Sequence, residues 1–176
     1  MLTEALSTDT LPSFCTARVL ILGVGNVLFG DDAFGPEVAD YILRHYQIPD
    51  DMYVMDVGTG VRKLLFTLTL SEKHPEEIIV VDAVDWGQDL GQVSEISASD
   101  LPVTKIDDFS LHQVPTSNML HELQERCGVK VSVIACDVAV MPGMIQPGMS
   151  DVVRTAVVTA AKMLAERYRL LPSTAV

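Results

Sequence analysis

A glycine-rich turn with two adjacent carboxylates is the feature that most restricts how this chain folds. Residues 19–24 form a continuous apolar run, typical of a buried strand, and residues 36–46 carry apolar side chains at helical spacing. Between them lie the glycine turn and the pair Asp31 and Asp32. A strand, a glycine turn and a helix usually bind a phosphate through backbone amides. Two negative charges there repel an anion and attract a cation, so the segment favours metal chemistry over nucleotide binding.

Strand and helix patterns alternate along the chain, which predicts an α/β protein with a three-layer sandwich. The expected strands cover 18–24, 52–57, 77–84, 91–97 and 129–135, and the expected helices cover 36–46, the leucine-rich segment 64–70, 116–127 and a long helix capped by Ser150. The third strand is apolar on both faces, as in the middle of a parallel sheet. Right-handed crossovers place the first strand beside the third, with the second outside the first.

Length and charge indicate one acidic globular domain, since the chain has 176 residues and a formal net charge of −12. We expect a flexible leader at 1–17, a single domain at 18–170 and a tail at 171–176. The acidity disfavours nucleic acid and anionic membrane as partners. No apolar run is long enough to span a bilayer, and the first residues lack the basic groups of a signal peptide. The three cysteines suit no disulfide framework, so a reducing cytoplasm is the expected location.

Three polar side chains are candidates for a divalent-metal site. Asp32 follows the first strand and Asp82 lies in the third. Because ligands bind at the carboxyl ends of such strands, where the strand order reverses, we expect both carboxylates at one crevice. His112 lies in a long loop before the helix at 116–127. Each residue also fits a plainer role as a cap or a solvated loop residue. Together they match the donors of a metal site with open positions.

Other chemistries fit the sequence less well. The glycines begin like a dinucleotide fingerprint, but Gly30 comes two positions late. The sequence contains neither a P-loop motif nor a nucleophile elbow. Cys136 ends the last strand, where it is either a nucleophile or soft ligand, or, more often, a small buried hydrophobe. A nucleotide- or flavin-binding oxidoreductase is therefore the weaker alternative.

Four motifs, in order, resemble those of the [NiFe]-hydrogenase maturation endopeptidases. They are Gly23-Val24-Gly25-Asn26 followed by Asp31-Asp32-Ala33-Phe34-Gly35, then Asp56-Val57-Gly58-Thr59-Gly60, Ile79-Val80-Val81-Asp82-Ala83 and Ser110-Leu111-His112-Gln113. The resemblance extends over residues 18–168. Within the family, residues 109–115 look most like the branch that serves the coenzyme F420-reducing hydrogenase of methanogenic archaea.

The resemblance implies a fold, a reaction and a set of site residues. The family fold is a twisted, mostly parallel five-stranded sheet with one antiparallel strand, which we expect at 91–97. The family reaction removes a C-terminal extension from a hydrogenase large-subunit precursor after nickel insertion, an aspartic-type endopeptidase activity. By this resemblance Asp32, Asp82 and His112 are the metal ligands and the catalytic residues. The nickel arrives with the substrate, so we expect no tightly bound metal in the resting protein.

The same resemblance suggests which residues contact the substrate. Asp31, Gly58, Thr59 and Gly60 are the candidates. Relatives often carry a Pro-acid pair after the last strand, where this chain has Cys136-Asp137, so a docking role for that turn is left open. The alternative for the same motifs is a non-catalytic, metal-dependent hydrogenase assembly chaperone.

Overall fold

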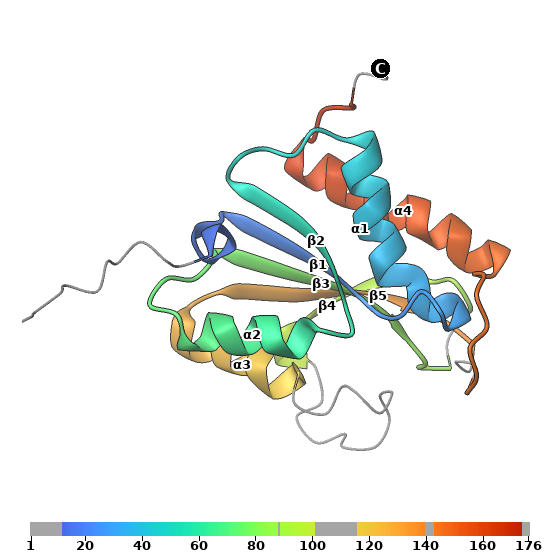
Figure 1. The fold of residues 1–176 in the computed structure, drawn as a ribbon, viewed down its shortest axis with the longest axis horizontal. Coiled ribbons are helices and arrows are strands. Elements are labelled where there is room, and N and C mark those ends of the chain that lie inside the picture. The colour runs from blue at the N-terminus through green and yellow to red at the C-terminus, as the bar shows by residue number, and fades with distance from the viewer. Residues whose placement is uncertain (1–11, 88, 101–115, 140–142, 174–176) are drawn as a thin grey trace, which may run out of the picture.

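A five-stranded sheet with the order β2-β1-β3-β5-β4 forms the centre of the molecule (Figure 1). The computed structural model describes residues 12–87, 89–100, 116–139 and 143–173. The strands are β1 (Val19–Val24), β2 (Met52–Gly58), β3 (Glu77–Val84), β4 (Val93–Ser97) and β5 (Lys130–Asp137). Neighbouring strands run parallel, except that β4 is antiparallel to β5. The predicted position of β1 between β2 and β3 and the predicted antiparallel strand are confirmed, and that strand, β4, lies at an edge of the sheet.

Helices cover both faces of this sheet (Figure 1). One face carries α1 (Phe34–His45) and α4 (Asp151–Tyr168), and the other carries α2 (Val61–Leu70) and α3 (Thr116–Cys127). Side chains alternate along β3, so Ile79 packs in the core under α1 and α4 while Ile78 packs in the core under α2 and α3. The apolar side chains on the two faces of β3 therefore pack into two separate cores. The predicted three-layer sandwich is confirmed.

The ends of several elements differ by a few residues from the expected ranges. A short 3₁₀ helix, η2 (Gly30–Ala33), leads into α1, which therefore starts at Phe34. β5 runs on to Asp137 because it pairs with β3 as far as Val84. The start of α4 is as expected, since the Ser150 hydroxyl accepts a hydrogen bond from the N–H of Val153 at 3.3 Å.

Residues outside the expected domain at 18–170 also contact the packed part of the chain. A 3₁₀ helix, η1 (Ser13–Thr16), buries Cys15 completely against the core. At the other end, the N–H of Gln47 donates to the Leu171 carbonyl at 2.8 Å. Both segments are too short to show a periodic pattern, and their partners lie far away in the sequence. Residues 1–11 and 174–176 lie outside the described part of the chain.

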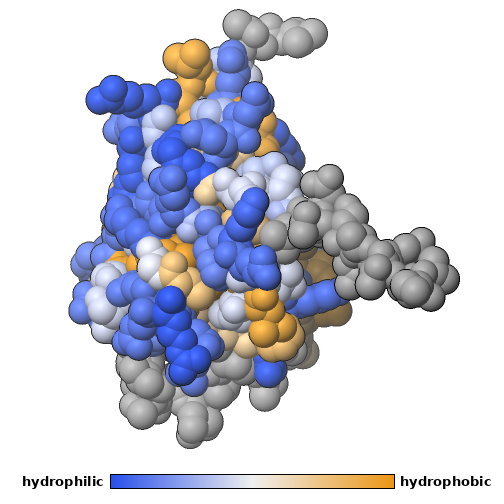
Figure 2. All heavy atoms as spheres, turned by 90° about the vertical axis from the view of Figure 1, so that its left-hand side faces the viewer, coloured by the Kyte–Doolittle hydropathy of each residue, from blue (hydrophilic) through white to orange (hydrophobic). Residues whose placement is uncertain are grey.

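The two ends of the strands present different surfaces. The four parallel strands begin on the left of Figure 1, and Figure 2 shows that this side is mostly hydrophilic. The candidate residues Asp32 and Asp82 belong to the opposite side, where β1 and β3 approach their carboxyl ends. In the described ranges of the chain, no helix combines the length and the apolar character needed to cross a membrane.

Candidate active site

Backbone contacts hold the turn after β1 in place. Gly25 has φ of +136°, and a Cβ at this position would lie 1.9 Å from the Asp32 carbonyl oxygen. The N–H of Gly25 donates to the Gly58 carbonyl and the N–H of Asn26 to the Asp32 carbonyl, both at 3.2 Å. Because these two amides already have carbonyl partners, they are not available to hold a phosphate. The geometry of the turn therefore disfavours the nucleotide-binding alternative.

Asp32 and Asp82 come from the same edge of the sheet. Gly35, at the start of α1, is wedged between β1 and β3, since a Cβ there would lie 2.2 Å from the carbonyl oxygens of both Val24 and Val81. Gly35 follows Asp32 by three residues, and Val81 directly precedes Asp82. The missing side chain of Gly35 thus lets the turn that carries Asp32 approach the segment that carries Asp82.

Asp82 is a buried carboxylate, with 9% of its surface exposed. It lies two residues from both Val80 and Val84, which pack in the core under α2 and α3. Residues two apart on a strand share a face, so the Asp82 side chain belongs to that face. Its Oδ1 accepts a hydrogen bond from the N–H of Ala83 at 2.9 Å. Since solvent screens a buried charge weakly, Asp82 would interact strongly with a cation placed at this edge.

The third predicted ligand, His112, lies outside the described residues. The chain is described again from Thr116, where α3 begins on the same face of the sheet as Asp82. Within the described ranges, which omit 101–115, no group of three His, Cys, Asp or Glu side chains could hold a metal ion. The trio of Asp32, Asp82 and His112 therefore stays a prediction.

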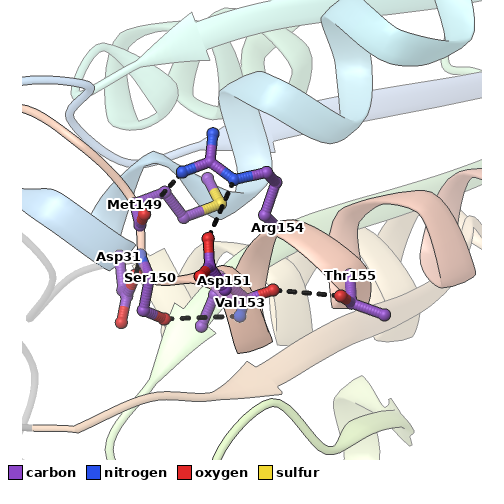
Figure 3. Close-up of polar contacts among 7 residues, drawn as sticks. All are labelled: Asp31, Met149, Ser150, Asp151, Val153, Arg154 and Thr155. Carbon is purple, nitrogen blue, oxygen red and sulfur yellow. Dashed lines mark hydrogen bonds and ion pairs between the residues drawn. The ribbon is translucent and has the colours of Figure 1, made fainter.

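Asp31 has a partner inside the fold. Its Oδ1 accepts a hydrogen bond from the N–H of Ser150 at 2.7 Å (Figure 3). Ser150 is the N-cap of α4, where the helix dipole favours a negative charge. The structure thus connects Asp31 to a helix 119 residues further along the chain. Its predicted contact with the substrate stays a prediction.

The turn after β2 borders the turn that carries Asp32. The Gly58 carbonyl accepts the N–H of Gly25, and the Gly58 N–H donates to Oδ1 of Asp56 at 2.9 Å. Thr59 and Gly60 follow and are exposed. These three candidate contact residues therefore lie beside the proposed site, and their contact with a substrate stays a prediction.

Cys136 is a buried thiol in the core under α1 and α4. Burial, followed by the negative charges of Asp31 and Asp137, raises the pKa of this thiol to about 12. A thiol with such a pKa carries almost no thiolate at neutral pH, so it is a poor nucleophile. The interpretation of Cys136 as a small buried hydrophobe is confirmed. The adjacent Asp137 is also buried and accepts the N–H of Trp86 at 3.1 Å, which holds the segment after β3.

Two loops beside Asp31 and Asp32 pair with each other, which the sequence analysis did not predict. We call them the paired loops, residues 26–30 and 143–150. Gly30 donates its N–H to the Gln146 carbonyl, and Gln146 donates its own to the Leu28 carbonyl, both at 2.8 Å. The paired loops expose four large apolar side chains: Val27, Leu28, Met144 and Ile145. The sequence contains one sign of this surface, because Met144 and Ile145 are apolar residues in a loop rich in glycine and proline. No periodic pattern indicates that this loop pairs with residues 26–30.

Comparison with known proteins identifies the family. A family model for hydrogenase maturation proteases, HycI, matches residues 36–167. The chain belongs to the hydrogenase maturation protease family. A protein of Methanocaldococcus jannaschii, provisionally named as a hydrogenase maturation protease, is 37% identical to it over 148 residues, covering 83% of this chain and 93% of that protein. The coenzyme F420 hydrogenase subunit delta of Methanothermobacter thermautotrophicus is 31% identical over 152 residues, covering 84% of this chain and 92% of that protein.

The fold agrees with this family. The solved structure of the hydrogenase maturating endopeptidase HybD from Escherichia coli superposes with a TM-score of 0.70 at 23% identity, covering 88% of this chain and 97% of that one. The likeness confirms the mostly parallel five-stranded sheet that the motifs implied. As a member of this family the chain is a protease, so the predicted enzyme class is confirmed.

Proposed function

We propose that this protease removes the C-terminal extension of a [NiFe]-hydrogenase large-subunit precursor after nickel has been inserted. The observation that carries the proposal is the position of Asp32 and Asp82 at one sheet edge in a chain of the maturation protease family. We further propose that the target is a coenzyme F420-reducing hydrogenase. The similarity to the coenzyme F420 hydrogenase subunit delta of Methanothermobacter thermautotrophicus supports that target.

In the proposed reaction, nickel is part of the substrate. Asp32 and Asp82 supply carboxylate oxygens and His112 supplies a neutral ring nitrogen, and together they complete the coordination of nickel already held by the cysteines of the precursor. Carboxylate and imidazole are both suitable ligands for a first-row divalent ion. The bound nickel then acts as a Lewis acid that polarises the scissile carbonyl or a nearby water. Cleavage would therefore depend on nickel loading, because a precursor without nickel lacks the ion that the three side chains bind.

Cleavage assays with nickel-loaded and nickel-free precursor test the proposal. Wild-type protein should shorten the nickel-loaded precursor, seen as a mass decrease, and should leave the nickel-free form intact. Replacing His112 by Ala should lower cleavage by at least about a hundredfold, because one of the three proposed ligands of the catalytic nickel is lost. We expect an unchanged melting temperature, because the sequence pattern predicts a loop at His112 and a loop histidine would contribute little to the core.

A matched histidine variant controls for nonspecific effects. His45 ends α1, where its ring stacks on Tyr41 with centroids 4.0 Å apart, and it has no role in the proposed site. His45→Ala should cleave like the wild type. Equal cleavage of both precursor forms would reject the dependence on nickel, and full activity of His112→Ala would remove His112 from the site. An unchanged precursor mass with wild-type protein would favour the chaperone alternative.

A further inference from the structure

Among the described residues, hydrogen bonds join the turn that carries Asp32 to the segment that leads into α4, and three of them involve Gly30, Gln146 and Asp31. Two of them are the backbone bonds of the paired loops, through Gly30, Gln146 and Leu28. The third is the bond from the Ser150 N–H to Oδ1 of Asp31, at 2.7 Å (Figure 3). Two backbone groups can pair whatever side chains they carry. Of these three bonds, the one to Asp31 therefore depends on the identity of a side chain.

The donor of this bond is held rigidly. Ser150 begins a helix of 18 residues, its hydroxyl accepts the N–H of Val153 at 3.3 Å, and its carbonyl accepts the N–H of Arg154 at 2.9 Å. Figure 3 shows Asp31 beside these first residues of α4. Val153 is fully buried in the core under α1 and α4, which fixes the start of the helix against the sheet. Asp31 thus connects the turn at Asp32 to a firmly packed element.

Asp31 and Asp82 belong to opposite layers of the sandwich. Asp31 binds the start of α4, and its charge acts on Cys136, which is buried under α1 and α4. Asp82 shares a face of β3 with Val80 and Val84, which pack under α2 and α3. A carboxylate directed to the α4 layer is badly placed to share one metal ion with Asp82. Asp31 is therefore better suited to support the adjacent Asp32 than to act as a ligand itself.

We propose that Asp31 is a positioning residue, which orients the turn of Asp32 by binding the Ser150 N–H and contacts neither nickel nor the precursor peptide. The inference rests on the proposed function. The bond to Asp31 is made one residue from Asp32, whereas the backbone bonds of the paired loops are made at Leu28 and Gly30. Small displacements of a catalytic group lower the rate of the chemical step, so the effect should fall on kcat rather than on KM.

The bond can be removed from either side, which gives the test. Asp31→Ala removes the acceptor, whereas Asp31→Asn keeps an oxygen that accepts the same N–H. Ser150→Pro removes the donor, and Ser150 has φ of −64°, an angle that proline adopts. Ser150→Ala is the matched control, because it removes the hydroxyl cap but keeps the N–H. The double variant Asp31→Ala with Ser150→Pro shows whether both changes act through one bond.

On nickel-loaded precursor, Asp31→Ala and Ser150→Pro should each lower kcat about tenfold, the effect expected for the loss of one hydrogen bond, with little change in KM. Asp31→Asn and Ser150→Ala should both keep a kcat within about twofold of the wild type. The double variant should be no slower than the single variants, because each removes the same bond. The inference is overturned if Asp31→Asn is as slow as Asp31→Ala, since the charge itself would then be required, or if the two losses multiply.

Amide hydrogen exchange of residues 26–32 tests the same bond without any cleavage. Exchange should rise in Asp31→Ala and Ser150→Pro but not in Asp31→Asn, and an unchanged rate in Asp31→Ala would overturn the inference. Asp32→Asn separates the two proposals, because it should abolish cleavage while leaving this exchange pattern intact. If the wild type does not cleave the precursor but the exchange pattern is as expected, the proposed function fails and the positioning role of Asp31 stands.

Discussion

At the scale of single residues, Cys136 shows how burial decides chemistry. The thiol is fully buried, and its pKa is raised to about 12, mainly by that burial. We therefore expect Cys136→Ala to cleave the precursor at the wild-type rate, with a loss of roughly 1 kcal/mol in the free energy of unfolding from the lost sulfur contacts. Initial cleavage rates and thermal melts measure the two effects separately.

Alkylation of the native protein provides a control for this prediction. Iodoacetamide should modify the partly exposed Cys127 before it modifies Cys136, as mass spectrometry of the labelled peptides would show. The two buried cysteines, Cys15 and Cys136, should react only after unfolding. Rapid labelling of native Cys136, or a large loss of activity in Cys136→Ala, would contradict its assignment as a packing residue.

At the scale of elements, an ion pair joins the edge strand β4 to α4. The Arg167 guanidinium contacts both carboxylate oxygens of Glu95, with Nη1 donating to Oε1 at 2.9 Å. This hydrogen bonding lowers the pKa of Glu95 below its ordinary value of 4.5. A carboxyl whose pKa is lowered by folding stabilises the native state above its unfolded pKa. That contribution is lost as the pH falls through the lower, folded value.

Glu95→Gln should therefore destabilise the protein at pH 7 by up to about 1 kcal/mol, because both partners are partly exposed and solvent screens the pair. The difference from the wild type should shrink as the pH falls below 4.5. Urea titrations at several pH values measure it. Glu122→Gln is the control, since Glu122 pairs with Arg126 on the exposed surface of α3 and should show a smaller effect. A difference that stays constant with pH would contradict the role of the ion pair.

At the scale of the whole molecule, the proposed site draws its donors from distant segments at one edge of the sheet. Three donors leave open positions on a metal ion, which the cysteines of the precursor fill in the proposed reaction. We therefore expect the purified protein to contain well below one metal ion per chain after gel filtration, as elemental analysis would measure. Nickel should remain bound when the protein forms a complex with the nickel-loaded precursor. A stoichiometric metal that survives dialysis of the protein alone would contradict this prediction.

Much of the fold followed from local patterns. The strand at 77–84 and the helix at 116–127 were predicted with the bounds that the structure has for β3 and α3. Continuous apolar runs and helical spacing are local signals, and the handedness of crossovers then restricts the strand order. Cys15 and Leu171 were assigned to loose ends because their contacts are with residues far along the chain, such as Ser71 and Gln47.

The sequence by itself determined the α/β layers, the order of the first three strands and the sheet edge to which Asp32 and Asp82 belong, because periodicity defines the elements and crossover handedness restricts their order. Only the tertiary structure decided the partner of Asp31, the pairing of the loops at 26–30 and 143–150, and the burial of Cys136. The first two features depend on which irregular segments meet when the layers pack, and the burial of Cys136 depends on the helices that cover β5. A hydrogen bond between two loops more than a hundred residues apart has no periodic pattern in the sequence.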